Sequence, residues 1–272
     1  MSAIEYWKNR VESHHAQSIN VQGDTWSSGD FWSSLASNFR ADPHRTEDPV
    51  LDRLFRMVEP ESTVLDVGGG AGRLALPLAL RCKHVTVAEP SDAMLEQLRE
   101  SAQEAGIENL SIVQATWDEA ETEAADTVVC AHVVYGVEAI ESFIRKLVAH
   151  ASKRVAMFAF METPPSRVAP FWKAVYGEER INMPALPELL QVLWEMDIYP
   201  DVEMLEAGSP QMFDSVDEAI EQGRRFLWVM PDTEQDKRYR EAARELIVAT
   251  PDGFVIKGAR PRRQGLISWR TD

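Results

Sequence analysis

The sequence predicts an α/β protein with a doubly wound, mostly parallel sheet. From Ser62 onward, short apolar runs alternate with amphipathic stretches, a pattern typical of repeated strand–helix units. The first of these runs ends in a glycine-rich loop, where a chain can turn sharply and approach a ligand. The 272 residues, 44% of them hydrophobic, suffice for one large domain or two small ones.

Five apolar runs predict the strands of the sheet. They are short, rich in β-branched residues and bounded by turn or helix signals, as buried strands of a parallel sheet are. The runs are Thr63–Val67, His84–Glu89, Leu110–Ala115, Thr127–His132 and Arg154–Phe160.

Helices are expected where apolar residues recur at three- and four-residue spacing. The predicted ranges are Pro49–Val58, Ser91–Ala105 and Val137–Val148. Ser91 is the expected N-cap of the second helix, and Gly106 lies just past its end. Pro77 falls in the helix expected after the glycine-rich loop, and we expect it to kink or shorten that helix.

We divide the chain into an N-terminal helical cap or lid (1–60), an α/β core (61–163) and a segment that completes the sheet with a helical insertion before the last strand (164–272). The cap is rich in aromatic residues, namely Tyr6, Trp7, Trp26, Phe31, Trp32 and Phe39. In the last segment we expect helices near Leu186–Met196, Val216–Val229 and Glu234–Ala249, and strands near Val202–Leu205, Phe254–Lys257 and Leu266–Trp269.

The composition favours a small-molecule substrate over a nucleic acid. The 28 Lys and Arg against 44 Asp and Glu give a formal net charge of −16, and so acidic a surface repels phosphate backbones. Cys82 and Cys130 are too few for a disulfide framework or a zinc site, and no metal is expected. The sequence has no membrane-spanning run, and its first residues are too polar for a signal peptide, so we expect a cytoplasmic protein that binds no membrane.

The strongest functional signal is the run from Asp66 to Gly72 (DVGGGAG), in which glycines alternate at positions 68, 70 and 72. Backbone N–H groups of such a loop can approach a ligand closely. A dinucleotide fingerprint would need a glycine at position 73, which is Arg73, so an NAD-dependent enzyme is disfavoured. Glu89 ends the second strand, where a carboxylate can accept both hydroxyls of a ribose; the alternative is a surface acid that merely ends the strand.

Residues 63–160 resemble a class I S-adenosylmethionine-dependent methyltransferase. The segments VLDVGGGAG (64–72), VTVAEPSDAML (85–95) and ADTVVCAHVVY (125–135) are similar to the first, second and fourth motifs of that family. The resemblance implies a Rossmann-like methyltransferase fold with seven strands, the last of them antiparallel and placed at Leu266–Trp269. It also implies S-adenosylmethionine as the cofactor.

The resemblance further implies where the cofactor lies. Its methionine part would lie near the alternate glycines, its ribose at Glu89 and its adenine beside Pro90 and Met94. The expected cofactor-binding residues are Asp66, Gly68, Gly69, Gly70, Gly72, Glu89, Pro90, Ser91, Met94, Thr116, Trp117 and His132.

The chain departs from the family pattern after the third strand, where relatives often hold the adenine amine with an Asp. Neither position 115 nor position 116 is acidic. The Thr116 hydroxyl and stacking on Trp117 are possible substitutes. Trp117 is equally well explained as a core residue.

His132 and Tyr135 follow the fourth strand and are the candidate catalytic residues. A histidine titrates near neutrality, so His132 would serve as a base for a hydroxyl acceptor. The alternative is that His132 caps the strand and shapes the cofactor pocket. His14 and His15 either contribute to the active site or belong to a solvent-exposed helix face. Met161, Glu162, Phe171 and Trp172 either line an acceptor pocket or are core residues.

These observations predict an enzyme, an S-adenosylmethionine-dependent methyltransferase that acts on a small-molecule acceptor as a monomer or homodimer. The alternatives are a non-catalytic S-adenosylmethionine-binding protein and an RNA or protein methyltransferase. One basic cluster could bind an anionic partner, although its glycines and proline predict a solvent-exposed hairpin loop instead. This cluster consists of Lys257, Arg260, Arg262 and Arg263.

Overall fold

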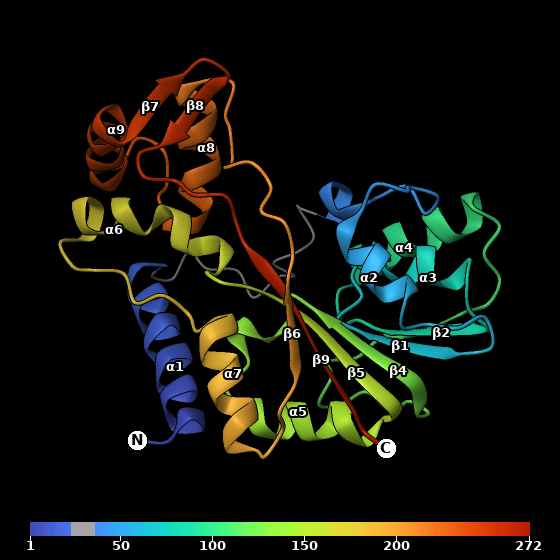
Figure 1. Cartoon of the computed structure of the whole chain (residues 1–272). Helices are drawn as coiled ribbons and strands as arrows, with labels where there is room; N and C mark the ends of the chain where they lie inside the picture. The colour runs from blue at the N-terminus through green and yellow to red at the C-terminus, as the bar shows by residue number, and fades with distance from the viewer. Residues whose placement is uncertain (23–35) are drawn as a thin grey trace. The chain divides into compact units, whose positions relative to one another are not determined.

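A computed structural model describes residues 1–22 and 36–272 of the chain (Figure 1). These residues form two compact units. The sheet unit contains residues 36–159, 193–205 and 265–272, and the helical unit contains residues 1–22, 160–192 and 206–264. The aromatic residues Trp26, Phe31 and Trp32 of the expected cap lie outside the described residues.

The sheet unit is built on a seven-stranded sheet with the strand order β3-β2-β1-β4-β5-β9-β6 (Figure 1). The first five strands along the chain run parallel to their neighbours, and β6 and β9 pair antiparallel. The predicted seven-stranded, mostly parallel sheet is therefore confirmed. The strands are β1 (Thr63–Val67), β2 (His84–Ala88), β3 (Leu110–Val113), β4 (Ala125–Ala131), β5 (Ala151–Phe160), β6 (Asp201–Met204) and β9 (Gln264–Arg270).

Strand β1 lies at the point where the strand order reverses. It pairs with β2 on one side and with β4 on the other, so that Val64 is opposite both Val85 and Thr127. The chain builds outward to β3 in one direction and to β5 in the other. Ligands of open α/β sheets bind outside the carboxyl ends of the strands at such a switch point. The loops after β1, β2 and β4 meet there.

Four helices flank the sheet within this unit, α2 (Pro49–Phe55), α3 (Ala75–Ala79), α4 (Asp92–Glu104) and α5 (Ile140–Ala149). The Ser91 hydroxyl caps α4 by accepting from the Met94 N–H at 3.2 Å, as predicted. Helix α3 has only five residues and contains Pro77, in agreement with the expected shortening. Helix α5 begins three residues later than predicted, because Val134–Gly136 forms a 3₁₀ turn.

The helical unit collects segments that are distant in the sequence. It contains α1 (Ala3–Gln22), α6 (Ala169–Tyr176), most of α7 (Leu186–Glu195), α8 (Val216–Leu227), α9 (Glu234–Leu246) and the hairpin of β7 (Ile247–Thr250) and β8 (Gly253–Ile256). The helix predicted to reach Ala249 ends at Leu246. Ile247, Val248 and Thr250 are β-branched, and they form β7 instead.

Two further predictions from the sequence are wrong for this unit. Residues 257–263, which include the basic cluster, form an exposed connection from β8 to β9. They are not a hairpin loop, because the hairpin partner of β8 is β7. Phe171 and Trp172 lie in α6, for which no helix was predicted, and both are buried in the core of the unit. Their contacts among the described residues are those of core residues.

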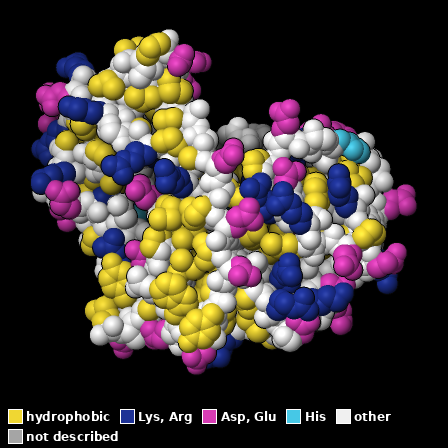
Figure 2. Space-filling model, viewed as in Figure 1, with side chains coloured by type: hydrophobic (Ala, Val, Ile, Leu, Met, Phe, Trp, Pro, Cys, Tyr) yellow, Lys and Arg dark blue, Asp and Glu magenta, His cyan; other side chains and the backbone are white. Residues whose placement is uncertain are grey.

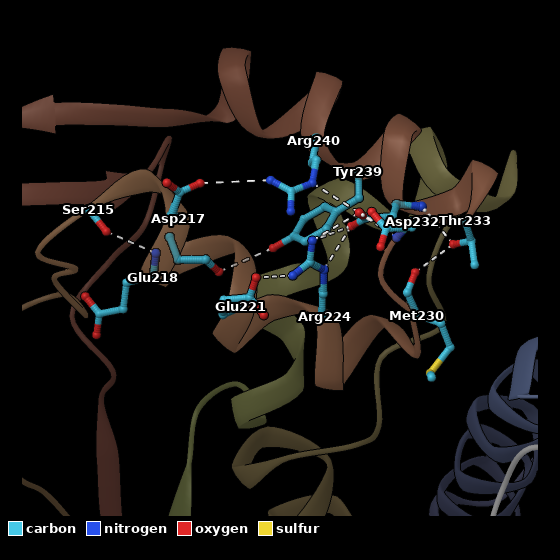
Figure 3. A network of polar contacts seen from close by, with 12 residues as sticks. Ser215, Asp217, Glu218, Glu221, Arg224, Met230, Asp232, Thr233, Tyr239 and Arg240 are labelled. Atoms are coloured by element: carbon cyan, nitrogen blue, oxygen red, sulfur yellow. Dashed lines mark hydrogen bonds and ion pairs between the residues drawn. The ribbon is translucent and has the colours of Figure 1, made fainter.

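A buried ion-pair network joins α8 to α9 (Figure 3). Arg224 donates to both carboxylate oxygens of Asp236, at 2.9 and 3.0 Å, and also contacts Glu221. Arg240 donates to Asp236 at 3.1 Å. Gly223 is required beside this network, because a Cβ there would lie 2.0 Å from the Tyr239 hydroxyl oxygen.

Helix α1 is attached to the rest of the helical unit through His14. Its Nδ1 lies 2.6 Å from the carbonyl oxygen of Ile181, and its Nε2 lies 2.8 Å from Nη2 of Arg180. A carbonyl only accepts and a guanidinium only donates, so Nδ1 carries the proton and the ring is neutral. Burial, followed by the charge of Arg180, lowers the pKa of His14 to about 4. His14 therefore stabilises the packing of α1, and it is not on a solvent-exposed face.

Candidate functional site

The glycine-rich loop after β1 turns through three left-handed glycines. Gly68, Gly70 and Gly72 have φ angles of 69°, 55° and 82°, which side chains rarely adopt. A Cβ on Gly68 or Gly72 would lie 2.4 or 2.2 Å from a neighbouring side chain, so packing also excludes larger residues at these two positions. At Gly70 the nearest atom would be the Met94 sulfur at 3.8 Å. Among the described residues, a side chain at Gly70 would meet only ordinary contact, so the left-handed backbone and not crowding favours glycine there.

Glu89 is held against this loop by two backbone donors. The Gly70 N–H donates to Oε2 at 3.0 Å, and the Ser91 N–H donates to Oε1 at 2.9 Å. The residue is 6% exposed, so it is not the surface acid of the alternative interpretation. The contacts orient Glu89 in the way that recognition of a ribose requires.

Asp66 lies in β1 beneath the same loop. Its Oδ2 is buried and has no hydrogen-bond partner within the described structure, and it would lie 2.9 Å from a Cβ on Gly69. Burial, followed by the charge of Glu89, raises the pKa of Asp66 to about 7, although a hydrogen bond with the backbone of Ala75 opposes the shift. An orphan acceptor is costly in a protein interior. A cationic ligand group at the loop would satisfy it.

The other expected residues of the second motif lie close to the glycine loop. Ser91 is buried at the start of α4, whereas Pro90 is exposed. Met94 is buried and packs with Ala36 and Ala71. The structure therefore brings together the residues predicted at positions 66–72 and 89–94.

Thr116 and Trp117 lie in a different environment. The exposed Thr116 donates its hydroxyl hydrogen to Glu119 at 2.9 Å. The indole N–H of Trp117 donates to the carbonyl oxygen of Phe143 in α5 at 3.3 Å, and the ring centre lies 4.7 Å from the Lys146 ammonium. These contacts are those of a core residue between β3 and α5.

His132 follows β4 in an unusual backbone conformation, with φ at 62°. Its N–H donates to the carbonyl oxygen of Phe158 in β5 at 2.9 Å, so the residue does cap the strand. Its Nδ1 lies 3.0 Å from the Tyr135 hydroxyl oxygen, and the two rings are stacked. Left-handed non-glycine residues cluster at functional sites, where the surrounding structure holds them in place. The pair thus has a fixed ring orientation at the carboxyl end of the sheet.

Arg73, which disfavoured a dinucleotide site, has a structural role that the sequence analysis did not identify. Its guanidinium lies 2.9 Å from Asp48 Oδ2. Asp48 also caps α2, accepting from the Val50 N–H at 2.9 Å. The Asp48-Pro49 dipeptide is a helix-start signal and could have identified the cap. Its pairing with Arg73, 25 residues away, has no local signal.

Neither a metal site nor a membrane-spanning helix is found in the described parts of the chain. Within residues 1–22 and 36–272, no cluster of His, Cys, Asp and Glu has the form of a metal site. None of the helices in these residues combines the length and apolar character that a bilayer crossing requires.

The strand order, the glycine loop after β1 and the acid that ends β2 define an α/β protein of the nucleoside-binding class. Residues 64–153 match the family model described as a methyltransferase domain. Together with the three motifs and the sheet topology, this match shows that residues 64–153, about a third of the chain, are similar to the methyltransferase domain of the class I S-adenosylmethionine-dependent family. S-adenosylmethionine is the cofactor of this family.

Comparisons with individual proteins agree with this assignment. An uncharacterized protein of Haemophilus influenzae is 27% identical over 177 residues, which are 64% of each chain. The ubiquinone biosynthesis O-methyltransferase of Rickettsia prowazekii is 38% identical over 88 residues, 32% of this chain and 34% of that enzyme. The chain thus spans less than two thirds of the length of either relative.

Solved structures show the same fold. A putative methyltransferase from Bacillus halodurans superposes with a TM-score of 0.57 at 15% identity, over 81% of this chain and 98% of that one. The YcgJ protein from Bacillus subtilis superposes with a TM-score of 0.56 at 16% identity, over 81% of this chain and 97% of that one. The fold is therefore that of the Rossmann-like methyltransferases.

Proposed function

We propose that this protein transfers the methyl group of S-adenosylmethionine to a small organic acceptor. The observation that carries the proposal is the cradle formed by the left-handed glycine loop at Gly70, the oriented carboxylate of Glu89 and the buried, unpaired oxygen of Asp66. These groups match the three chemical features of the cofactor near the loop, which are a flexible methionine chain, a ribose diol and positive charge.

When bound, S-adenosylmethionine supplies a methyl group that a nucleophile displaces in line from a positively charged sulfur. In our proposal Glu89 accepts from the ribose hydroxyls and fixes the nucleoside. The carboxyl of Asp66 balances the positive charge of the methionine part. Because the donor is already activated, alignment and exclusion of water provide most of the rate acceleration.

His132 is the residue that we propose to accept a proton from a hydroxyl acceptor. The contact of Tyr135 with Nδ1 at 3.0 Å orients the imidazole, and the backbone bond to Phe158 fixes its place at the end of β4. The Rickettsia relative is named as an O-methyltransferase, which favours a hydroxyl among the possible acceptors. Base catalysis of this kind contributes roughly 10²–10⁴-fold to a rate.

A small acceptor suits the charge of the protein better than a nucleic acid. The net charge is −16, and basic side chains are scattered among acidic ones on the face that Figure 2 shows. On that face the described residues form no continuous positive path for a phosphate backbone. We propose that the enzyme acts in the cytoplasm, as a monomer or homodimer.

Calorimetric titration with S-adenosylhomocysteine tests the proposal, with NADH as the competing ligand. We expect saturable binding of the first and none of the second. Glu89→Ala should weaken S-adenosylhomocysteine binding by about 1.5–3 kcal/mol, the range for hydrogen bonds to a charged group. Glu96→Ala, which removes an exposed carboxylate of α4, is the matched control and should leave the affinity unchanged. An unaltered affinity in Glu89→Ala would remove Glu89 from the site.

A further inference from the structure

The carboxyl group of Asp66 lies in surroundings that disfavour its negative charge. The residue is 2% exposed in the central strand β1, and its register partners on the two neighbouring strands are Val87 and Val129. One oxygen forms a hydrogen bond with the backbone of Ala75, and the other, Oδ2, is buried without a partner among the described residues. In such a place an ionised carboxylate costs far more free energy than the protonated acid.

A second carboxylate at the same loop adds to this cost. The Gly70 N–H donates to Glu89 at 3.0 Å. A Cβ on the adjacent Gly69 would lie 2.9 Å from Oδ2 of Asp66, so the two acids adjoin consecutive residues of one loop. The backbone donors of Gly70 and Ser91 favour the negative charge on Glu89, and a second negative charge beside it is disfavoured. We therefore expect Asp66 to hold the proton when no ligand is bound.

Within the described residues, the other charged and titratable groups around Asp66 supply no counter-charge. Burial, followed by the charge of Asp66, raises the pKa of the Cys130 thiol in β4, which therefore stays neutral. Arg73, which follows the glycine loop, directs its guanidinium to Asp48 at 2.9 Å. Burial, followed by the charge of Glu89, raises the pKa of Asp66 itself to about 7. The electrostatics thus agree with the geometry.

A positively charged ligand at the loop reverses this balance. A positive charge close to a carboxyl group favours its ionised form and lowers its pKa. S-adenosylmethionine carries an ammonium group and a sulfonium against a single carboxylate, so it is positively charged overall. In the proposed function its methionine part lies at the glycine loop. Its arrival therefore favours loss of the proton from the buried acid.

We propose that binding of S-adenosylmethionine releases the proton of Asp66, so that the affinity of the site for its cofactor rises with pH through neutrality. This inference rests on the proposed function. The O–H bond of the carboxylic acid breaks, its electron pair stays on the oxygen, and the proton passes to the buffer. The cofactor itself is unchanged. Asp66 thus makes the binding step depend on pH, and it is distinct from His132, which acts on the acceptor.

Calorimetric titration of the full chain with S-adenosylmethionine, in two buffers of different ionisation enthalpy, counts the protons released. We expect about half a proton per ligand near pH 7 and almost none near about pH 8.5. The affinity should rise by about fivefold or more from about pH 5.5 to about pH 7.5 and then level off. Asp66→Asn cannot ionise, so it should release no proton, and its affinity should change by less than about twofold over this range. Asp52→Asn, at an exposed position of α2, is the matched control and should behave as the wild type does.

Three results would overturn the proton release from Asp66. These are binding without proton release near pH 7, an affinity that stays constant or falls as the pH rises, and an unchanged proton count in Asp66→Asn. Asp66→Ser is a second neutral variant that decides the question if Asp66→Asn does not fold. Failure of the wild type to bind either S-adenosylmethionine or S-adenosylhomocysteine at any pH would instead contradict the proposed function. The two failures are therefore distinguishable.

Discussion

Asp66 in the sheet unit and Asp236 in the helical unit are equally buried, with 2% of each exposed, but their environments are opposite. Asp236 accepts from Arg224 and Arg240, whereas Oδ2 of Asp66 has no partner in the described structure. Burial alone would raise the pKa of Asp236, but its hydrogen bonds with Arg224 and Arg240 lower that pKa below its ordinary value. In contrast, burial, followed by the charge of Glu89, raises the pKa of Asp66 to about 7. The protein itself satisfies the carboxylate of Asp236, which therefore stabilises the fold, whereas in our proposal the unpaired oxygen of Asp66 serves the cofactor.

Removing the saturated carboxylate should have the largest effect. Asp236→Asn leaves the buried guanidinium of Arg224 without its main counter-charge, and loss of one partner of a buried pair costs about 3–5 kcal/mol. We expect the free energy of unfolding, measured in urea at neutral pH, to fall by this amount. The affinity for S-adenosylhomocysteine should be unchanged.

The exposed pair of Glu141 and Arg145 provides the control for this experiment. Their side chains are 43% and 65% exposed, and such pairs contribute about 0.5 kcal/mol or less. Glu141→Gln should therefore alter stability little. Equal losses in the Asp236 and Glu141 variants would contradict a structural role for the network in Figure 3.

Asp66 should make the protein less stable as the pH rises. Its pKa is about 7 in the folded chain, against an ordinary value of 3.8, so the folded state binds more protons than the unfolded state between these values. The free energy of unfolding then decreases from about pH 4 to about pH 7, by up to about 4 kcal/mol from this group. Asp66→Asn removes the loss. In urea unfolding at about pH 4.5 and about pH 7.5, the free energy of unfolding of the variant should exceed that of the wild type only at the higher pH.

His14 should have the opposite effect in the helical unit. Burial, then the charges of Arg180, His15 and Arg10, lower its pKa from 6.5 to about 4, with the Ile181 backbone bond opposing. Between these values the unfolded state binds more protons, so stability is lost as the pH falls from about 6.5 to about 4, by up to about 3 kcal/mol. His14→Gln removes this dependence, which urea unfolding across the same range measures.

The two pH dependences overlap and partly cancel in the wild type. Asp66→Asn should therefore reveal a stability that increases with pH between about 4 and 6.5, and His14→Gln one that decreases. If stability changed with pH in the same direction in Asp66→Asn and in His14→Gln, the opposite roles assigned to Asp66 and His14 would be wrong. The double variant serves as the control, because it should vary least with pH.

The sequence predicted the sheet unit far better than the helical unit, for a physical reason. The bounds of β1 and the cap of α4 follow from local features, which are a short buried run and a serine before an amphipathic stretch. The helical unit instead depends on contacts between distant residues, such as the hydrogen bond between Arg180 and His14, 166 positions apart. Periodicity cannot reveal such a pairing.

In the candidate site, too, some features could be predicted from the sequence and others could not. The alternate glycines and Glu89 were found because strand ends and glycine spacing are visible in the sequence, and the structure places them together. The orphan oxygen of Asp66 could not be found, because it depends on which donors are missing around it. Trp117 could not be assigned at all, since the sequence allowed adenine stacking and core packing equally.

Trp117→Phe distinguishes these two roles and has the smallest expected effect. The ring packs against Phe143 and His150 of the α5 region, and the indole N–H donates to the Phe143 carbonyl oxygen. Phenylalanine keeps most of the packing and loses the hydrogen bond, so we expect stability to fall by about 1 kcal/mol. The affinity for S-adenosylhomocysteine should not change.

The same substitution at Trp194, whose residue is 52% exposed on α7, provides the control and should leave both quantities unchanged. A tenfold weaker affinity in Trp117→Phe without loss of stability would place the indole at the adenine. In that case the cradle at Gly70 and Glu89 would extend to the loop after β3, and the chain would replace the missing acid of its relatives by an aromatic ring.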